Sequence, residues 1–142
     1  MYKFSKRSLS AIKELHPKLQ AVVNEAIKTV DFTVLDARRG KIEQERAYRA
    51  GNSKARFGES AHNYSPAIAF DFVPYPLTWN EEKYKPIAKA ILAAAKKLNV
   101  PIRWGADWDM DGKWNDEKFL DWGHFELNPW RTYAKQSKLY RG

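Results

Sequence analysis

The sequence predicts a single α+β domain over residues 1–142, with a small, mainly antiparallel sheet and helices packed on one side. Helical and strand patterns alternate along the chain, and the strand patterns are few and short. A hydrophobic content of 44% in 142 residues is sufficient for one packed core. The sequence contains no cysteine, which excludes disulfides, thiolate nucleophiles and thiolate zinc sites.

Three segments have the apolar spacing of helices. Residues 17–29 begin with Pro17, which is favoured at the first helical position, and repeat apolar side chains every three or four residues. Residues 41–51 show a shorter helical pattern. Residues 81–99 show the longest one, and Asn80 is a suitable N-cap for it.

Four shorter segments are rich in β-branched and aromatic residues, which is typical of strands. These segments are residues 31–37, 67–73, the beginning of 101–108, and 122–127. Residues 52–66 and 109–119 are polar and are expected to be loops. The strand order stays open at this point.

The net charge of +8 and the pI of about 9.6 favour a polyanionic partner, such as nucleic acid, anionic lipid or an acidic cell wall. No nucleic-acid-binding motif is recognisable. No apolar segment has signal-peptide or membrane-spanning length, so we expect a soluble protein made in the cytoplasm. Residues 128–142 form a basic, aromatic tail that either packs on the core or binds a sugar or nucleic-acid strand.

Two of the three histidines lie where strands are expected to begin or end. His62 precedes one strand, His124 lies in another, and Asp71 lies near the end of the strand that follows His62. Catalytic zinc takes three ligands of these types and keeps a fourth position for water. His62, Asp71 and His124 are therefore a candidate metal set, whereas the third histidine, His16, is expected to be exposed or to cap a helix.

A hydrolytic metal site also needs a carboxylate that accepts the proton of water and passes it to the leaving amine. Asp121 lies three residues before His124 and could take this role. The alternative is structural, because a histidine beside a strand is more often a hydrogen-bonded residue of the core. Spacing alone leaves both interpretations open.

Four segments in this order resemble a family of zinc peptidases: DARRGKIEQERAYRAG, SAHNYSPAIAFDFVP, IRWGADW and DWGHFEL. The family includes phage L-alanyl-D-glutamate endopeptidases (endolysins) and D-alanyl-D-alanine carboxypeptidases. Its pattern is an arginine followed by Glu-Gln, then Ser-x-His, a carboxylate inside a strand, and a late acid-x-x-His. The resemblance runs from about residue 17 to residue 127 and is specific because the motifs occur together.

The resemblance implies that His62, Asp71 and His124 bind Zn²⁺ and that Asp121 is the general base and then the general acid. Many relatives have six residues between the first histidine and the aspartate ligand, whereas this chain has eight. A strict register would place Ala69 at the ligand position, and alanine cannot bind a metal. The resemblance therefore requires a longer turn before the strand.

Further roles follow from the same resemblance. Arg39 would hold the substrate carbonyl or carboxylate and stabilise the oxyanion, with Arg38 as the alternative because the arginine is doubled. Ser60 would orient the site through a hydrogen bond. Glu126 lies two residues after His124 on a strand, so it should point to the same face and support that ligand.

A separate signal suggests Ca²⁺ as a possible second cofactor. Asp107, Asp109 and Asp111 alternate, and Gly112 follows at the sixth place of what would be an EF-hand loop. The twelfth place holds Lys118 instead of the required glutamate. The alternative is an acidic turn held by side-chain hydrogen bonds.

The resemblance implies a monomeric phage endolysin that cleaves the L-alanyl-D-glutamate bond of the peptidoglycan stem. It would be made in the host cytoplasm without a signal peptide and would reach the wall through a separate membrane-permeabilising protein. Its partner would be peptidoglycan, with no nucleic acid and no membrane span. The alternatives are a D-alanyl-D-alanine dipeptidase or carboxypeptidase, and a non-catalytic basic module that binds wall or nucleic acid.

Overall fold

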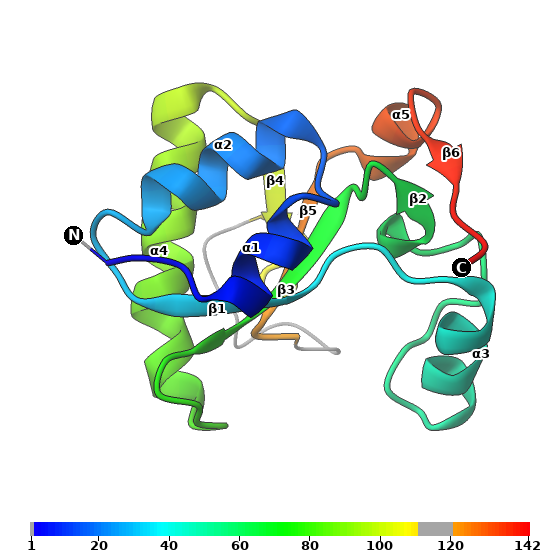
Figure 1. Cartoon of the computed structure of the whole chain (residues 1–142), viewed down its shortest axis with the longest axis horizontal. Coiled ribbons are helices and arrows are strands. Elements are labelled where there is room, and N and C mark those ends of the chain that lie inside the picture. The colour runs from blue at the N-terminus through cyan, green and yellow to red at the C-terminus, as the bar shows by residue number, and fades with distance from the viewer. Residues whose placement is uncertain (1, 111–120) are drawn as a thin grey trace.

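The computed structural model describes residues 2–110 and 121–142 (Figure 1). Within these ranges the helices are α1 (Lys6–Ile12), α2 (Pro17–Ala26), α3 (Lys41–Arg49), α4 (Glu81–Leu98), α5 (Trp130–Ala134) and the short 3₁₀ helix η1 (Ala61–Asn63). The strands are β1 (Phe32–Asp36), β2 (Tyr64–Ser65), β3 (Ala69–Pro74), β4 (Ile102–Trp104), β5 (His124–Leu127) and β6 (Lys138–Leu139). The predicted α+β class is confirmed.

The main sheet has four strands in the order β1-β3-β5-β4, and every neighbouring pair is antiparallel. The register pairs Asp71 of β3 with His124 of β5. It also pairs Arg103 of β4 with Glu126 of β5. Strands β2 and β6 form a separate two-stranded ribbon. The sheet thus brings polar side chains from three distant segments next to one another.

The two faces of this sheet differ because side chains alternate along each strand. Phe70, Phe72 and Phe125 are fully buried and stack on one face, with the ring centroids of Phe125 5.8 Å from Phe70 and 5.9 Å from Phe72. Asp71 and His124, one position away from these phenylalanines, point to the opposite face. The hydrophobic core therefore holds one face of the sheet and fixes the position of the polar groups on the other.

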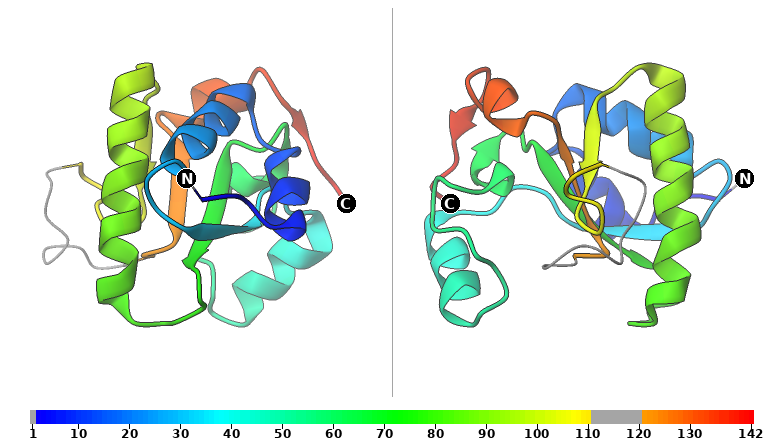
Figure 2. Two further views of the ribbon diagram at one scale, coloured as in Figure 1. Left: turned by 60° about the vertical axis from the view of Figure 1, so that its left-hand side comes forward. Right: turned by 180° about the vertical axis from the view of Figure 1, so that it is seen from behind.

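Helices α1, α2 and α4 form the layer that packs with the sheet: α1 contacts β1, and α4 contacts α2, β3 and β4. Helix α3 lies on the opposite side of the molecule from α4 (Figures 1 and 2). Helix α2 starts at Pro17, where the His16 Nδ1 accepts a hydrogen bond from the Lys18 N–H at 3.1 Å. Asn80 caps α4 as expected, and Asn99 ends that helix in a left-handed conformation.

Several elements were not predicted from the sequence. Helix α1 and the ribbon strands β2 and β6 are too short for a periodic pattern, and the expected loop 52–66 contains η1 and all of β2. The tail 128–142 is part of the fold, because the Tyr140 N–H donates to the Asn63 carbonyl at 2.7 Å. Arg38 lies over the Tyr140 ring at 4.5 Å. Among the described residues, no helix combines the length and apolar character that a bilayer crossing requires.

Candidate metal centre and active site

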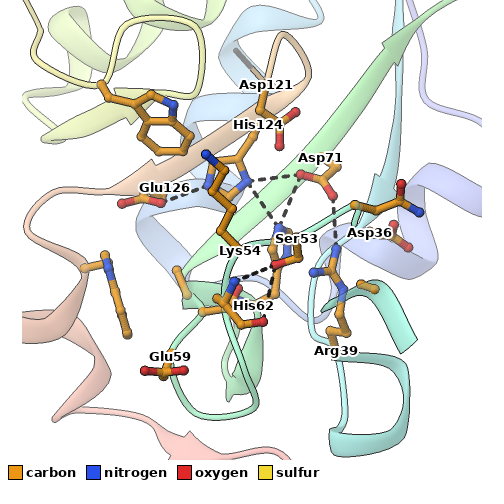
Figure 3. Close-up of a pocket in the computed structure, with 17 residues that line it drawn as sticks. Asp36, Arg39, Ser53, Lys54, Glu59, His62, Asp71, Asp121, His124 and Glu126 are labelled. Atoms are coloured by element: carbon orange, nitrogen blue, oxygen red, sulfur yellow. Dashed lines mark hydrogen bonds and ion pairs between the residues drawn. The ribbon is translucent and has the colours of Figure 1, made fainter. Parts of the chain in front are cut away.

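Three side chains converge at the polar face of the sheet: His62 from η1, Asp71 from β3 and His124 from β5 (Figure 3). The Oδ1 atom of Asp71 lies 3.2 Å from the Nε2 of His62 and 3.1 Å from the Nδ1 of His124. The two imidazole nitrogens are 3.3 Å apart. The predicted set of three is therefore brought together in space.

The eight-residue spacing between His62 and Asp71 is taken up by the end of η1, strand β2 and the turn that leads into β3. Ala69 and Asp71 share one face of β3, and Ala69 lies opposite Glu126 while Asp71 lies opposite His124. The register of β3 on β5 thus puts the aspartate, and not the alanine, beside the histidines.

Hydrogen bonds on the far side of each ring leave the inward-facing nitrogens available as ligands. The His62 Nδ1 lies 2.6 Å from the Ala37 carbonyl oxygen, and the His124 Nε2 lies 2.9 Å from the Glu126 Oε1. A carbonyl and a carboxylate can only accept, so each of these ring nitrogens donates its proton. Once deprotonated, both remaining nitrogens would direct lone pairs at the point that they share with Asp71, as at many metal sites.

The separations of these atoms fit a tetrahedral metal centre. Zinc–nitrogen bonds of about 2.0–2.1 Å at tetrahedral angles place neighbouring ligand atoms about 3.3 Å apart. The three separations here are 3.1, 3.2 and 3.3 Å. Two imidazoles and one carboxylate are ligands typical of zinc and similar transition metals, whereas calcium and magnesium prefer oxygen alone. The residues present thus fit a divalent metal with one open position.

Charge interactions inside this group are strong because the two histidines are buried and Asp71 is half-buried. Burial alone would raise the pKa of Asp71, but the His62 charge and hydrogen bonds from both imidazoles hold it well below its usual range. Burial alone would lower the pKa of His124, but hydrogen bonds to Asp71 and Glu126 and their charges raise it to about 10. Without a metal, the site therefore holds a proton at neutral pH.

Glu126 links His124 to a further cation. Its Oε1 accepts from the His124 Nε2, while its Oε2 lies 2.7 Å from the Nη2 of Arg103. Although burial raises the pKa of Glu126, these two partners lower it overall, so the buried carboxylate stays charged. As expected from strand alternation, Glu126 lies on the same face as His124 and fixes its ring.

Asp121 lies beside this group and lines the same cavity (Figure 3). Its backbone N–H donates to the Gly105 carbonyl at 2.9 Å, and its carbonyl accepts from the His124 N–H at 3.3 Å. Burial and the nearby charge of Asp71 raise the pKa of the Asp121 carboxyl. A carboxyl with a raised pKa beside a metal site is suited to proton transfer near neutral pH.

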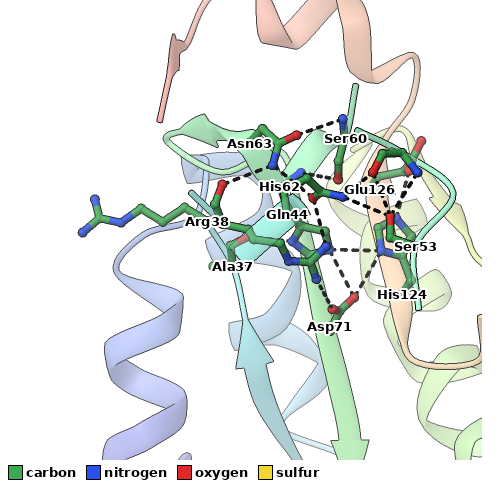
Figure 4. A network of polar contacts seen from close by, with 12 residues as sticks. Ala37, Arg38, Gln44, Ser53, Ser60, His62, Asn63, Asp71, His124 and Glu126 are labelled. Atoms are coloured by element: carbon green, nitrogen blue, oxygen red, sulfur yellow. Dashed lines mark hydrogen bonds and ion pairs between the residues drawn. The ribbon is translucent and has the colours of Figure 1, made fainter. Parts of the chain in front are cut away.

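Of the two neighbouring arginines, Arg39 lines the cavity and Arg38 does not. The Nη2 of Arg39 lies 3.4 Å from the Oδ2 of Asp71, and its Nη1 donates to the Gln44 Oε1 at 3.2 Å. Arg38 points away from the site (Figure 4), and its Nε lies 3.5 Å from the Glu14 Oε2. The geometry therefore favours Arg39 as the arginine of the site.

A buried pair of amides, missed as functional by the sequence analysis, holds this arginine (Figure 4). Gln44 and Asn63 are both fully buried, and the Gln44 Oε1 accepts from Arg39 and from the Asn63 Nδ2 at 3.1 Å. The Gln44 Nε2 donates to the Ala55 carbonyl at 2.7 Å. The only signal in the sequence was that Gln44 belongs to the arginine segment.

Ser60 acts through the backbone. Its Oγ accepts a hydrogen bond from the His62 N–H at 3.2 Å, and it is the N-cap of η1. The Asn63 side chain in turn accepts from the Ser60 N–H at 3.1 Å, which completes a capping box. The serine therefore fixes the turn that carries the first histidine.

The predicted calcium segment is described only in part. The Asp107 N–H donates to the Trp104 carbonyl at 3.0 Å, and the Asp107 carbonyl accepts from Met110 at 3.1 Å. Asp109 is described as well, but Asp111, Gly112 and the remainder of the segment to residue 118 lie outside the described residues. Calcium binding thus remains a prediction from the sequence.

Comparisons with known proteins agree with this geometry. The family model described as phage L-alanyl-D-glutamate peptidase matches residues 1–128. The L-alanyl-D-glutamate peptidase of Escherichia phage T5 is 31% identical over 135 residues, which cover 89% of this chain and 98% of the phage T5 protein. The crystal structure of the Serratia marcescens L-Ala D-Glu endopeptidase ChiX matches with a TM-score of 0.73 and 28% identity, covering 93% of this chain and 94% of that one. This chain belongs to the phage L-alanyl-D-glutamate peptidase family.

Proposed function

We propose that this chain is a zinc-dependent endolysin that cleaves the L-alanyl-D-glutamate bond in the peptide stem of bacterial peptidoglycan. The observation that carries the proposal is the convergence of His62, Asp71 and His124, with ligand atoms 3.1–3.3 Å apart, beside the carboxyl of Asp121. Membership of the phage L-alanyl-D-glutamate peptidase family supports the choice of bond.

When bound, zinc would act as a Lewis acid for the scissile carbonyl and would make water more acidic. The raised pKa of Asp121 suits this carboxyl to accept the proton of the attacking water and to return it to the leaving amine. Gly105 lets the backbone of Asp121 approach the sheet closely, because a Cβ at position 105 would lie 2.5 Å from the Asp121 carbonyl oxygen. This contact holds the acid–base group at the site.

Arg39 supplies the positive charge that the reaction needs at the carbonyl oxygen as it becomes an oxyanion. Its guanidinium is held between Asp71 and Gln44 and faces the cavity. Because both partners are fixed, little reorganisation is needed when charge develops. Glu126 and Ser60 position the two histidines and do not touch the reacting atoms in this proposal.

The test is digestion of purified peptidoglycan followed by mass spectrometry of the products. We expect new stem fragments with an amino-terminal D-glutamate. Release of D-alanine alone would instead support the carboxypeptidase alternative. Binding to the wall without any cleavage would support the non-catalytic alternative.

Matched variants test whether cleavage depends on the residues of this site. His124→Ala and Asp121→Asn should both abolish cleavage, but only His124→Ala should also reduce bound zinc, measured by elemental analysis. His16→Ala is the control, because His16 caps α2 through the Lys18 N–H and lies outside the cavity. Equal loss of activity in all three variants would point to a general folding defect.

The net charge of +8 would retain the enzyme on the anionic wall, so its binding to the wall should weaken as the salt concentration rises. We propose that the enzyme acts as a monomer, which size-exclusion chromatography with light scattering can test.

We also propose that it reaches the wall through a separate membrane-permeabilising protein. Expression in host cells without such a protein should then leave the cells intact, whereas added purified enzyme should lyse permeabilised cells.

We propose that calcium is a second cofactor and that it binds to the acidic segment that begins at Asp107. A chelator that binds calcium and spares zinc should then lower activity, and added calcium should restore it. Activity that is unchanged by this chelator would favour the alternative of an acidic turn.

A further inference from the structure

A second cavity lies directly beside the metal site. It has a volume of about 340 Å³, and the cavity that contains the metal site has a volume of about 560 Å³. The two cavities share Asp36, Asp71 and Asp121 in their linings. The site therefore lies in the middle of a groove. One arm is lined by residues from the end of α3 and the loop after it, and the other arm is lined by residues at the beginning of α4.

The arm beside α4 has an aromatic wall formed by Trp79, Tyr84 and Trp122. Trp79 is 74% exposed, which is unusual for the largest apolar side chain, whereas Tyr84 is buried and donates through its hydroxyl to the Thr78 carbonyl at 3.2 Å. An exposed ring and a fixed ring that line the same arm provide an apolar surface for a flat ligand. The exposed Trp79 ring lies outside the hydrophobic core formed by the described residues.

The two arms differ in charge. Among the described residues, the arm beside α4 adds the acidic Glu81 to the three shared aspartates and is lined by no lysine or arginine. The nearby Lys85 lies 5.5 Å from the centre of the Trp122 ring, and its ammonium is paired with Glu82 at 2.7 Å. This arm should therefore disfavour a carboxylate.

The other arm contains the cations among the described lining residues, Arg39 and Lys54. Two carboxylates, Glu59 and Glu126, also line it, and Glu126 is already paired with Arg103 and His124. Asn52 and Ser53 add polar side chains at the same end of the groove. This arm is therefore the better place for a substrate group that carries a negative charge.

We propose that the arm beside α4 binds the N-acetylmuramyl-L-alanine side of the substrate, with the sugar ring on Trp79, and that the D-glutamate side lies in the arm with Arg39 and Lys54. This assignment rests on the proposed function. The D-glutamate of the stem is linked through its side chain and so keeps a free α-carboxylate next to the scissile bond. The muramyl-alanine side is uncharged there, and a sugar ring presents C–H groups that pack on an aromatic face.

The direction of the substrate follows from this assignment. The stem would run from the α4 arm across Asp71 and Asp121 into the arm near α3. A groove that continues on both sides of the metal site suits a bond inside the stem, because the chain must leave the site in both directions.

The experiment compares kcat/KM for two substrates: a muramyl tripeptide, and the same tripeptide without the sugar. Trp79→Ala should lower kcat/KM for the muramyl tripeptide about tenfold, which corresponds to ~1.4 kcal/mol of lost stacking, and should change the sugar-free peptide less than twofold. Trp79→Phe should recover most of the loss. Tyr75→Ala is the matched control, because Tyr75 is 65% exposed in the same segment but lines a different cavity.

A second comparison tests the direction of the substrate. Wild-type enzyme should prefer a stem peptide with D-glutamate over one with D-isoglutamine, in which the α-carboxylate is an amide. Lys54→Ala should reduce this preference, whereas Trp79→Ala should leave it unchanged.

Equal losses on the sugar-bearing and sugar-free substrates in Trp79→Ala, or no loss on either, would overturn the sugar assignment. Loss of the D-glutamate preference in Trp79→Ala would overturn the direction. Both results require a wild-type enzyme that cleaves the peptides, so they are distinct from failure of the proposed function. If the proposed function is wrong, the wild-type enzyme will cleave neither substrate.

Discussion

Binding of a divalent metal to this protein should release about one proton per chain at neutral pH. In the metal-free site, the Nε2 of His62 and the Nδ1 of His124 face each other at 3.3 Å, and both lie against the Oδ1 of Asp71. The outer ring nitrogens already donate to Ala37 and Glu126. The raised pKa of His124 places a proton among the inward-facing atoms at neutral pH, and a metal ion has to displace it.

The size of the effect follows from the pKa of His124, which is raised to about 10 from 6.5. Below pH 10 the metal competes with one proton, so its apparent affinity should rise about tenfold for each pH unit between pH 7 and 9. The stability of the metal-free fold has the opposite dependence on pH and falls as the pH rises. Because the folded pKa is raised, this histidine stabilises the metal-free protein fully below pH 6.5, and the stabilisation is lost as the pH rises toward 10.

The assay is isothermal titration calorimetry with zinc at one pH in two non-coordinating buffers with different enthalpies of ionisation. The difference between the observed enthalpies gives the number of protons released. Competition with a chelator at several pH values then gives the pH dependence of affinity. Zinc binding with no proton release, and an affinity that does not change from pH 7 to 9, would refute the arrangement of hydrogen bonds described for this site.

Three further predictions concern the metal site and the core that supports it. Gln44→Leu removes the buried acceptor of Arg39 at a cost of about 1–3 kcal/mol, so kcat/KM on a stem peptide should fall at least about tenfold and Gln44→Glu should restore part of it. Phe125→Ala should lower the free energy of unfolding by about 3–5 kcal/mol in a urea titration, and a loss below about 1 kcal/mol would contradict the packing of the core. Gly105→Ala should displace Asp121 and His124, whose Cβ atoms would lie 2.9 Å and 3.0 Å from the new Cβ, so turnover and bound zinc should both fall. Turnover equal to wild type in this variant would mean that the position of Asp121 is not critical.

The sequence predicted the parts of the fold that have a strong local signal. The apolar repeat of 81–99, the cap at Asn80 and the alternation around Asp71 and His124 correspond to α4, β3 and β5. The order of the strands could not be read from the sequence, because pairing is decided by contacts between distant segments. The ribbon of β2 and β6, with two residues in each strand, carried no periodic pattern at all.

In the site, too, residues with a local sequence signal were predicted and those that depend on distant contacts were not. The metal set was recognisable because histidines are rare in this chain and lie at the ends of strands, and Glu126 followed from alternation with His124. The choice between Arg39 and Arg38 required coordinates, since neighbouring residues in a loop can point in any direction. The role of Gln44 was invisible because its partners, including Ala55, lie on both sides of it in the chain and meet only after folding.

Anomalous diffraction at the zinc absorption edge, from crystals of the metal-loaded protein, is the most direct measurement of the central claim. One peak should lie about 2.0–2.2 Å from the Nε2 of His62, the Oδ1 of Asp71 and the Nδ1 of His124, with the carboxyl of Asp121 facing the fourth position. A peak bound by other side chains, or none in protein that cleaves peptidoglycan, would contradict the account.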